Sequence, residues 1–218
     1  AQKEESYGSQ CTGSVVVLDV NDFSVLCAQS YPNYDLDKYM NDPQYREDLL
    51  LNKDGQNAMW NRCFWQGYPI GSAMKPAVAL AALQEGVIDT STQFRCGYTY
   101  YNADMPDFHP LCMGTHGYLN VIEALTVSCN IFFYDTGYNL GIDNMNLYQR
   151  KLGLGELTGV EIYESDGTLA GPDEKEDWYG GDTIMAAIGQ SENQFTPMQL
   201  AAYTSALANG GPRYRATF

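Results

Sequence analysis

A serine and a lysine stand three residues apart at the start of an apolar run, in the segment GYPIGSAMKPAVALAAL. Ser72 and Lys75 precede seven consecutive apolar residues at 77–83, a composition typical of a buried helix. At i and i+3 on a helix, the two side chains lie on one face and can meet. A serine hydroxyl becomes a nucleophile when a neighbouring base takes its proton, and burial can make a lysine that base by lowering its pKa. The pair predicts an activated serine, although the same spacing also arises by chance because both residues are common.

A second polar pair, Ser128 and Asn130, lies in the segment VSCNIFF. Capping of a helix start is the ordinary explanation for such residues. The functional interpretation is a second hydroxyl that relays protons and an amide that holds a substrate peptide group. An S-x-x-K motif followed by an S-x-N motif is more specific than either motif alone.

The elements that must position these residues follow a simple order along the chain. Alternating and β-branched residues at 13–20 and 24–31 predict an antiparallel hairpin. The remaining expectations are an irregular stretch at 32–62, a loop at 90–117, and helices at 72–86, 119–141 (one or two), 147–154 and 196–211. Because a two-stranded hairpin is marginal in water, we expect further strands beyond residue 218.

Composition limits the classes of function. The formal net charge of -15 argues against a nucleic-acid partner, since phosphate binding requires a surplus of lysine and arginine. The hydrophobic fraction of 44% is typical of a globular chain with a real core. No apolar stretch approaches the ~20 residues that span a bilayer, so any membrane anchor is expected outside these residues.

Nearly the whole sequence resembles the transpeptidase domain of the penicillin-binding proteins. The resemblance rests on GSVVVLDVNDFSVLCAQSYPNYD, on YPIGSAMKP with its S-x-x-K, on HGYLNVIEALTVSCNIFFYDTGYNLG with its S-x-N, and on AAIGQSENQFTPMQLAAYTSALANGG. The last stretch is similar to the high-molecular-weight, membrane-anchored, class B-like enzymes rather than to secreted β-lactamases. The implied fold is α/β of the α+β type, an antiparallel sheet flanked by helices. Residues 1–218 would form the N-terminal and central part of one transpeptidase domain, with only the first two strands of its sheet.

The resemblance also implies roles for the two motifs. Ser72 would be the acylated nucleophile, Lys75 its general base, Ser128 the proton relay to the leaving group, and Asn130 the ligand of the substrate amide. The implied activity is a peptidoglycan D,D-transpeptidase that forms an acyl-enzyme with D-Ala-D-Ala stem peptides and is acylated by β-lactams. Such chemistry needs no metal or organic cofactor. The implied partners are proteins of the cell-wall synthesis complex, at the extracytoplasmic face of the bacterial membrane.

One departure from the family leaves alternatives open. The third family motif, K-[ST]-G on a strand, does not occur in these residues. In the family this strand supplies one N–H of the oxyanion hole, and loss of such a donor costs ~10²–10³ in rate, so these residues alone are expected not to turn over substrate. The alternatives are a β-lactam sensor or β-lactamase of the same fold, and a non-catalytic cell-wall scaffold.

Cysteines and histidines cluster in the segment 96–116. Cys96, Cys112 and His116, with His109 nearby, could supply zinc ligands, although the spacing fits no strong zinc template. A Cys96–Cys112 disulfide and free thiols are the other interpretations. A histidine-glycine pair before the S-x-N helix also occurs in the resembled family, which favours a structural His116.

Gly189, in the segment AAIGQSENQF, is a further candidate near the site. A residue without Cβ can permit a tight approach of two backbones, and a simple turn is the alternative.

Overall fold

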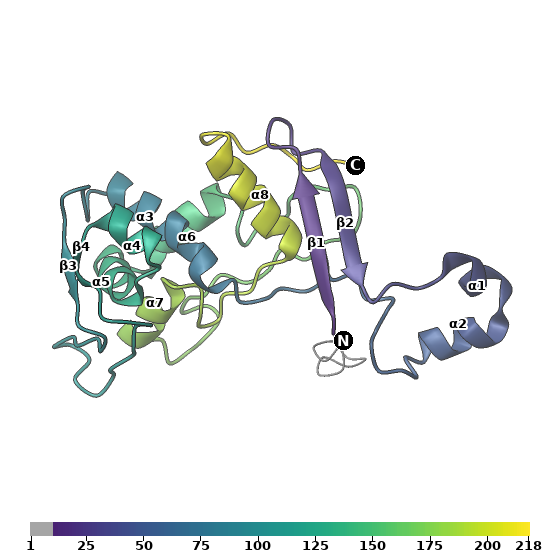
Figure 1. The fold of residues 1–218 in the computed structure, drawn as a ribbon, viewed down its shortest axis with the longest axis horizontal. Helices are drawn as coiled ribbons and strands as arrows, with labels where there is room; N and C mark the ends of the chain where they lie inside the picture. Colours follow the sequence, from purple (N-terminus) through teal and green to yellow (C-terminus); the bar gives the residue numbers. More distant parts are fainter. Residues whose placement is uncertain (1–10) are drawn as a thin grey trace, which may run out of the picture. The chain divides into compact units, whose positions relative to one another are not determined.

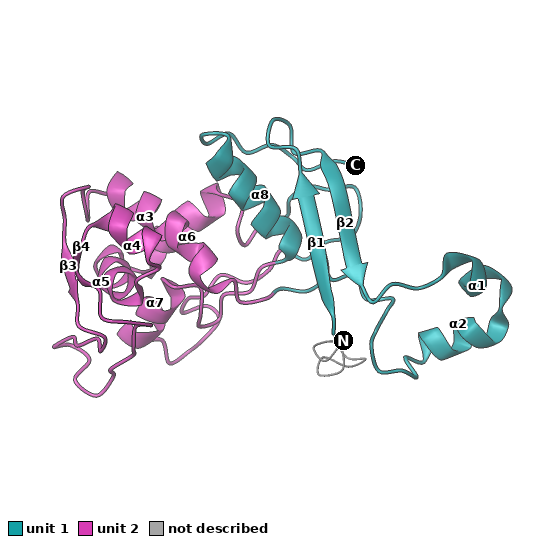
Figure 2. Ribbon diagram, in the orientation of Figure 1, with its two compact units in different colours: residues 1–67, 157–165, 196–218 teal, residues 68–156, 166–195 magenta. Residues whose placement is uncertain are grey.

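The computed structural model describes residues 11–218 and divides them into two compact units (Figures 1 and 2). The first unit comprises residues up to 67 together with 157–165 and 196–218, and the second comprises 68–156 and 166–195. The expected single domain over 1–218 stays a prediction, and its residues 1–10 lie outside the described part.

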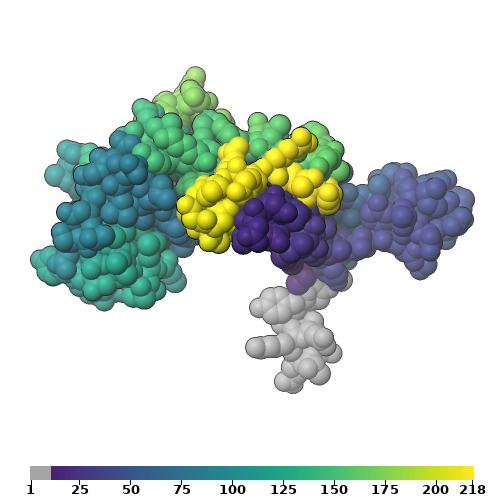
Figure 3. Space-filling view, turned by 90° about the horizontal axis from the view of Figure 1, so that it is seen from above, coloured from purple at the N-terminus to yellow at the C-terminus, as the bar shows by residue number. Residues whose placement is uncertain are grey.

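A β-hairpin packed against one helix forms the core of the first unit. Strands β1 (Gly13–Leu18) and β2 (Val25–Tyr31) pair antiparallel from Gly13↔Tyr31 to Leu18↔Val25, which confirms the predicted hairpin. Helix α8 (Pro197–Ala208) lies against β1, as the adjacent yellow and purple surfaces in Figure 3 show. Between them lies a core that includes Phe23, Phe64, Met198, Ala202 and Ala206. Next to β2, Ser24 and Thr217 form an isolated β-bridge, and the Val25 N–H donates to the Thr217 carbonyl at 2.8 Å.

Two short helices occupy part of the stretch that was expected to be irregular. These are α1 (Leu36–Asn41) and α2 (Pro43–Leu50), and neither contains a buried residue. The residues that cap these two helices can be recognised in the sequence. Asp35 accepts a hydrogen bond from the Lys38 N–H, and Asp42, directly before Pro43, accepts from two N–H groups of α2. The expectation of an irregular stretch was wrong at 36–50, because it rested on polar composition and turn signals, whereas caps mark these two polar helices.

The second unit is mostly helical. It contains η2 (Gly71–Met74), α3 (Lys75–Gln84), β3 (Phe94–Cys96), β4 (Gly117–Leu119), α4 (Val121–Thr126), α5 (Asn130–Leu140), α6 (Ile142–Lys151) and α7 (Gly180–Ala186). Helix α3 packs against α5 and α6, and α5 also packs against α7. The prediction of a loop over 90–117 was wrong near its two ends, because strands β3 and β4 lie there and pair antiparallel with each other. Helix α3 is buried along most of its length, but Leu80 and Leu83 are partly exposed, so it is not buried all round as predicted.

No helix among residues 11–218 is long and apolar enough to cross a membrane.

Candidate active site

Ser72 lies in a single 3-10 turn, η2, that leads directly into α3. The sequence predicted a helix from this serine, and the structure begins the regular α-helix three residues later, at Lys75. Within the turn the Lys75 N–H donates to the Ser72 carbonyl, while the neighbouring Met74 side chain is buried. Ser72 itself is an exposed residue.

Lys75 is almost completely buried, with 1% of its surface exposed. Its Nζ donates three hydrogen bonds, at 2.7 Å to the Ser128 carbonyl, 3.0 Å to the Ser128 Oγ and 2.7 Å to the Asn130 Oδ1. An ammonium has three donors, so all of them are satisfied. This network explains how a lysine is tolerated on an apolar helix.

Burial lowers the pKa of Lys75 to about 8, because desolvation disfavours the charged form. The neighbouring thiols of Cys112 and Cys129 act in the opposite direction. The amine can therefore lose its proton near neutral pH, as a general base must.

Ser128 and Asn130 lie where α4 ends and α5 begins. Ser128 has a φ of 52°, a left-handed conformation that is uncommon for a residue with a side chain. The N-cap of α5 is Cys129, and no side chain caps this helix end, so helix capping does not explain the pair. Both residues instead turn polar groups toward Lys75, and such local strain is often found at functional sites.

The structure thus brings three of the four predicted residues into direct contact. Among residues 11–218, the described hydrogen bonds include none from the Ser72 hydroxyl, and the Lys75 amine is directed to Ser128 and Asn130. Ser72 is adjacent through the turn that it shares with Lys75. The site therefore combines an exposed serine with a buried amine whose pKa is lowered, three residues along the same turn, and a second hydroxyl bound to that amine.

Gly189 contacts the first residue of η2, the turn that carries Ser72. The Gly71 N–H donates to the Gly189 carbonyl at 3.0 Å, and a Cβ placed on Gly189 would lie 2.1 Å from the Gly71 carbonyl oxygen. Its φ is 74°, a region that favours glycine. The predicted close approach of two backbones is confirmed, next to Ser72.

The predicted cluster of cysteines and histidine is present, but the residues that form it differ from the prediction. One ligand atom each from Cys96, Cys112, His116 and Cys129 lies within 4.8 Å of all the others. The His116 Nδ1 is 3.4 Å from the Cys96 Sγ and 3.6 Å from the Cys112 Sγ, and the sulfurs of Cys112 and Cys129 are 3.9 Å apart. His109 lies outside the cluster, against the Tyr101 ring. Cys129, the middle residue of the S-x-N motif, was missed because sequence spacing alone did not join it to the other three.

This donor set has the chemistry of a structural zinc site. Zinc prefers four tetrahedral thiolate and imidazole ligands, and three thiols with one imidazole match it. All three cysteines are free thiols in the structure. Although burial opposes a thiolate at Cys112, N–H groups of Gly114, Ile131 and Asn130 outweigh it and lower the pKa of Cys112 to about 6. The cluster could hold a metal ion, and one of its four residues, Cys129, is the middle residue of the S-x-N motif.

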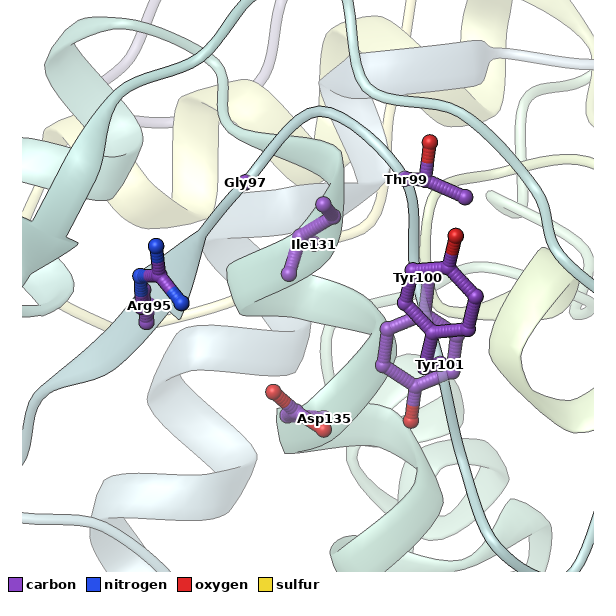
Figure 4. Close-up of a pocket in the computed structure, with 7 residues that line it drawn as sticks. All are labelled: Arg95, Gly97, Thr99, Tyr100, Tyr101, Ile131 and Asp135. Carbon is purple, nitrogen blue, oxygen red and sulfur yellow. The ribbon is translucent and has the colours of Figure 1, made fainter.

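A separate cavity of about 330 Å³ lies in the second unit (Figure 4). Its lining residues are Arg95, Gly97, Thr99, Tyr100, Tyr101, Ile131 and Asp135. Burial raises the pKa of Asp135, while the Tyr100 hydroxyl lowers it. None of the four candidate catalytic residues lines this cavity, so it is separate from the candidate active site.

Comparison with known proteins gives consistent matches. Peptidoglycan D,D-transpeptidase MrdA of Acinetobacter baumannii is 31% identical over 206 residues, and MrdA of Haemophilus influenzae is 34% identical over 206 residues. Each match covers 91% of this chain, which spans about a third of these relatives (31% and 32%).

Solved structures agree in fold. Pseudomonas aeruginosa PBP2, in complex with WCK 5153, superposes with a TM-score of 0.86 at 28% identity, over 98% of this chain and 50% of that one. A penicillin-binding protein (PBP2) from Helicobacter pylori gives a TM-score of 0.87 at 27% identity, over 100% of this chain and 42% of that one. These neighbours confirm the expected α/β fold.

The family described as penicillin binding protein transpeptidase domain matches residues 13–218, which include both hydroxyl-bearing motifs and the buried lysine. The chain therefore belongs to the penicillin-binding protein transpeptidase family.

Proposed function

We propose that this chain carries the nucleophile and general base of a peptidoglycan D,D-transpeptidase. The observation that carries the proposal is the buried Lys75 amine, which joins the S-x-x-K motif to the S-x-N motif through hydrogen bonds to Ser128 and Asn130. The relatives at 31% and 34% identity bear the name of this activity, which supports a transpeptidase over a β-lactamase or β-lactam sensor.

The first half-reaction is formation of the acyl-enzyme. Neutral Lys75 accepts the Ser72 hydroxyl proton as the Ser72 Oγ attacks the carbonyl of the D-Ala-D-Ala peptide bond. The lowered pKa of Lys75, about 8, makes the neutral amine accessible near physiological pH. The tetrahedral intermediate collapses when the C–N bond breaks, and Ser128 passes the proton to the departing D-Ala nitrogen.

The second half-reaction transfers the acyl group. An amine of a neighbouring stem peptide attacks the ester carbonyl, loses its proton through the same groups, and releases Ser72 with its proton restored. In a β-lactam the ring amide takes the place of the peptide bond. The leaving nitrogen then stays attached to the acyl group, so the adduct persists.

Asn130 is proposed to orient the substrate. Its Oδ1 is occupied by Lys75, so the Nδ2 is the group left to donate to a substrate carbonyl. The Nδ2 contact with the Leu111 carbonyl is 3.5 Å, long enough to be exchanged for a substrate at small cost.

The test is mass spectrometry, after incubation with labelled penicillin, of the purified chain extended through a K-[ST]-G strand, because residues 1–218 alone are expected not to turn over substrate. The adduct is expected on the peptide containing Ser72, absent from Ser72→Ala and retained by Ser91→Ala, a change at another exposed serine. An adduct that decays rapidly would indicate a β-lactamase. No adduct on a chain extended through a K-[ST]-G strand would indicate the non-catalytic scaffold.

We also propose that the protein acts outside the cytoplasmic membrane within a cell-wall synthesis complex. A similar structure, at 26% identity, is a complex between PBP2 and MreC from Helicobacter pylori. Another, at 30% identity, is from a peptidoglycan synthase complex that coordinates polymerization and crosslinking. Labelling of intact cells by a fluorescent penicillin that does not cross the membrane tests the location, since a cytoplasmic enzyme would stay unlabelled.

A further inference from the structure

A second cavity, of about 340 Å³, lies in the first unit between the end of β2 and the segment before η2. It is lined by Ala28, Gln29, Ser30, Asn33, Tyr34, Ala58, Met59, Trp60, Asn61 and Trp65. These residues include three aromatic rings and several amides, but no charged side chain. A concave site with apolar faces and a few polar groups is typical of small-molecule binding.

Two tryptophans form a corner of this cavity. The Trp60 and Trp65 rings are 5.5 Å apart between centroids with an angle of 86° between their planes. The Trp65 Nε1 donates to the Tyr163 carbonyl at 3.1 Å, which fixes its ring, whereas Trp60 is 42% exposed. An exposed tryptophan beside a fixed one offers an apolar face for a flat ligand.

The loop that carries Trp60 is held in place by a buried arginine. The Arg62 guanidinium donates to three backbone carbonyls, at 3.1 Å to Asn57, 3.2 Å to Trp60 and 2.7 Å to Gln56. These charge-assisted bonds tie a polar surface loop to a buried side chain. Trp60 is therefore presented in one position before any ligand arrives, which reduces the entropy lost on binding.

Two amide groups have defined orientations at the cavity. The Asn61 Oδ1 accepts from the Cys63 N–H at 3.2 Å, and the Asn33 Oδ1 accepts from the Tyr34 N–H at 2.9 Å. In the described part of the chain, the side-chain hydrogen bonds of both asparagines use the Oδ1 and leave the Nδ2 groups aside. Both therefore remain available as donors to a ligand with carbonyl or hydroxyl oxygens.

Apolar ring faces, amide donors and the lack of charge together fit a neutral sugar. A pyranose ring has C–H groups on its faces and oxygens around its rim, and an acetamido substituent adds a carbonyl acceptor. We propose that this cavity binds an N-acetylated sugar unit of a glycan strand, an inference that rests on the proposed action on peptidoglycan. It would hold the strand while its stem peptide reacts elsewhere on the enzyme.

The test is isothermal titration of the purified protein with the tetramer of N-acetylglucosamine. We expect saturable binding, weakened at least tenfold in Trp60→Ala and less in Trp60→Phe, which keeps a ring. Tyr118→Ala, at a tyrosine of β4 that is 66% exposed in the other unit, is the matched control and should bind as the unaltered protein does. The glucose tetramer should bind more weakly because it lacks the acetamido carbonyl.

The possible outcomes separate this inference from the proposed function. Penicillin adduct formation at Ser72 is measured on the same samples and should be equal in Trp60→Ala, because Trp60 is not one of the proposed catalytic residues. Absence of saturable sugar binding, or equal affinity in Trp60→Ala, overturns the sugar site even where the adduct forms. Loss of cross-linking to another cell-wall protein in Trp60→Ala, with sugar binding intact, would make the cavity a protein interface and also overturns it.

Discussion

The Lys75 Nζ lies 2.7 Å from the Asn130 Oδ1, so one buried ammonium joins helix α3 to the first residue of helix α5. The lysine satisfies its three donors on the S-x-N segment, and that segment depends on the lysine in turn. Any change at one partner is therefore expected to affect both chemistry and stability.

Replacement of Lys75 by methionine separates these two effects. The variant keeps an unbranched side chain, one heavy atom shorter, but removes the base, so penicillin acylation at Ser72 should fall by ~10²–10⁴-fold. It also leaves the Ser128 and Asn130 acceptors without their buried donor, at a cost of ~1–3 kcal/mol in unfolding free energy. Stopped-flow acylation and denaturant unfolding measure the two quantities. Lys151→Met, at the end of α6, is the control, and an unchanged acylation rate in Lys75→Met would exclude the lysine as base.

The pH dependence follows from the lowered pKa of Lys75. Acylation requires the neutral amine, so its rate should rise with pH and level off above about pH 8. The free energy of unfolding also depends on the protonation of Lys75. Between about pH 8 and the ordinary lysine pKa of 10.5, the unfolded chain binds more protons at this lysine than the folded chain does. The free energy of unfolding therefore rises with pH through that window.

Asn130→Asp provides the matching test of this pKa. A carboxylate at the Asn130 position would favour the charged lysine, raise its pKa and move the acylation profile to higher pH. Asn139→Asp, near the exposed end of the same helix, should leave the profile in place. Coincident profiles for the Asn130 variant and the unaltered protein would show that another group controls the rate.

Local patterns in the sequence predicted the hairpin, α3 and α8, and predicted helix at 119–141 without deciding between one helix and the two observed. Local patterns fail where tertiary contacts or helix caps determine the secondary structure. Strands β3 and β4 have three residues each, too short for a periodic pattern, and α7 begins with two glycines. Likewise Ser72 and Lys75 were readable as a pair, but the orientation of the lysine toward Ser128 depends on how α3 packs against α5.

Gly189→Ala tests the support of the nucleophile turn. A Cβ there would meet the Gly71 carbonyl at 2.1 Å in a backbone region unfavourable to alanine, so the turn must move. Gly86→Ala is the control, because Gly86 has a similar φ of 69° but nothing within 4 Å. The control should lose only the ~1–2 kcal/mol of a left-handed alanine and keep its acylation rate. Gly189→Ala should lose more stability and also acylate more slowly, and equal effects in the two variants would contradict a role at Ser72.

The Cys96–Cys112–His116–Cys129 cluster is expected to bind one zinc ion per chain. Because Cys129 lies between Ser128 and Asn130, and the Asn130 N–H donates to the Cys112 Sγ at 3.3 Å, a bound ion would hold the S-x-N segment. Elemental analysis of protein purified without chelator should give a stoichiometry near one. Chelation should release it, lower the melting temperature and slow acylation at Ser72. Cys129→Ser should lose the metal, whereas Cys27→Ser, at an exposed free thiol, should retain it. Metal-free protein that has unchanged stability and six titratable thiols would show that the cluster is a group of free cysteines.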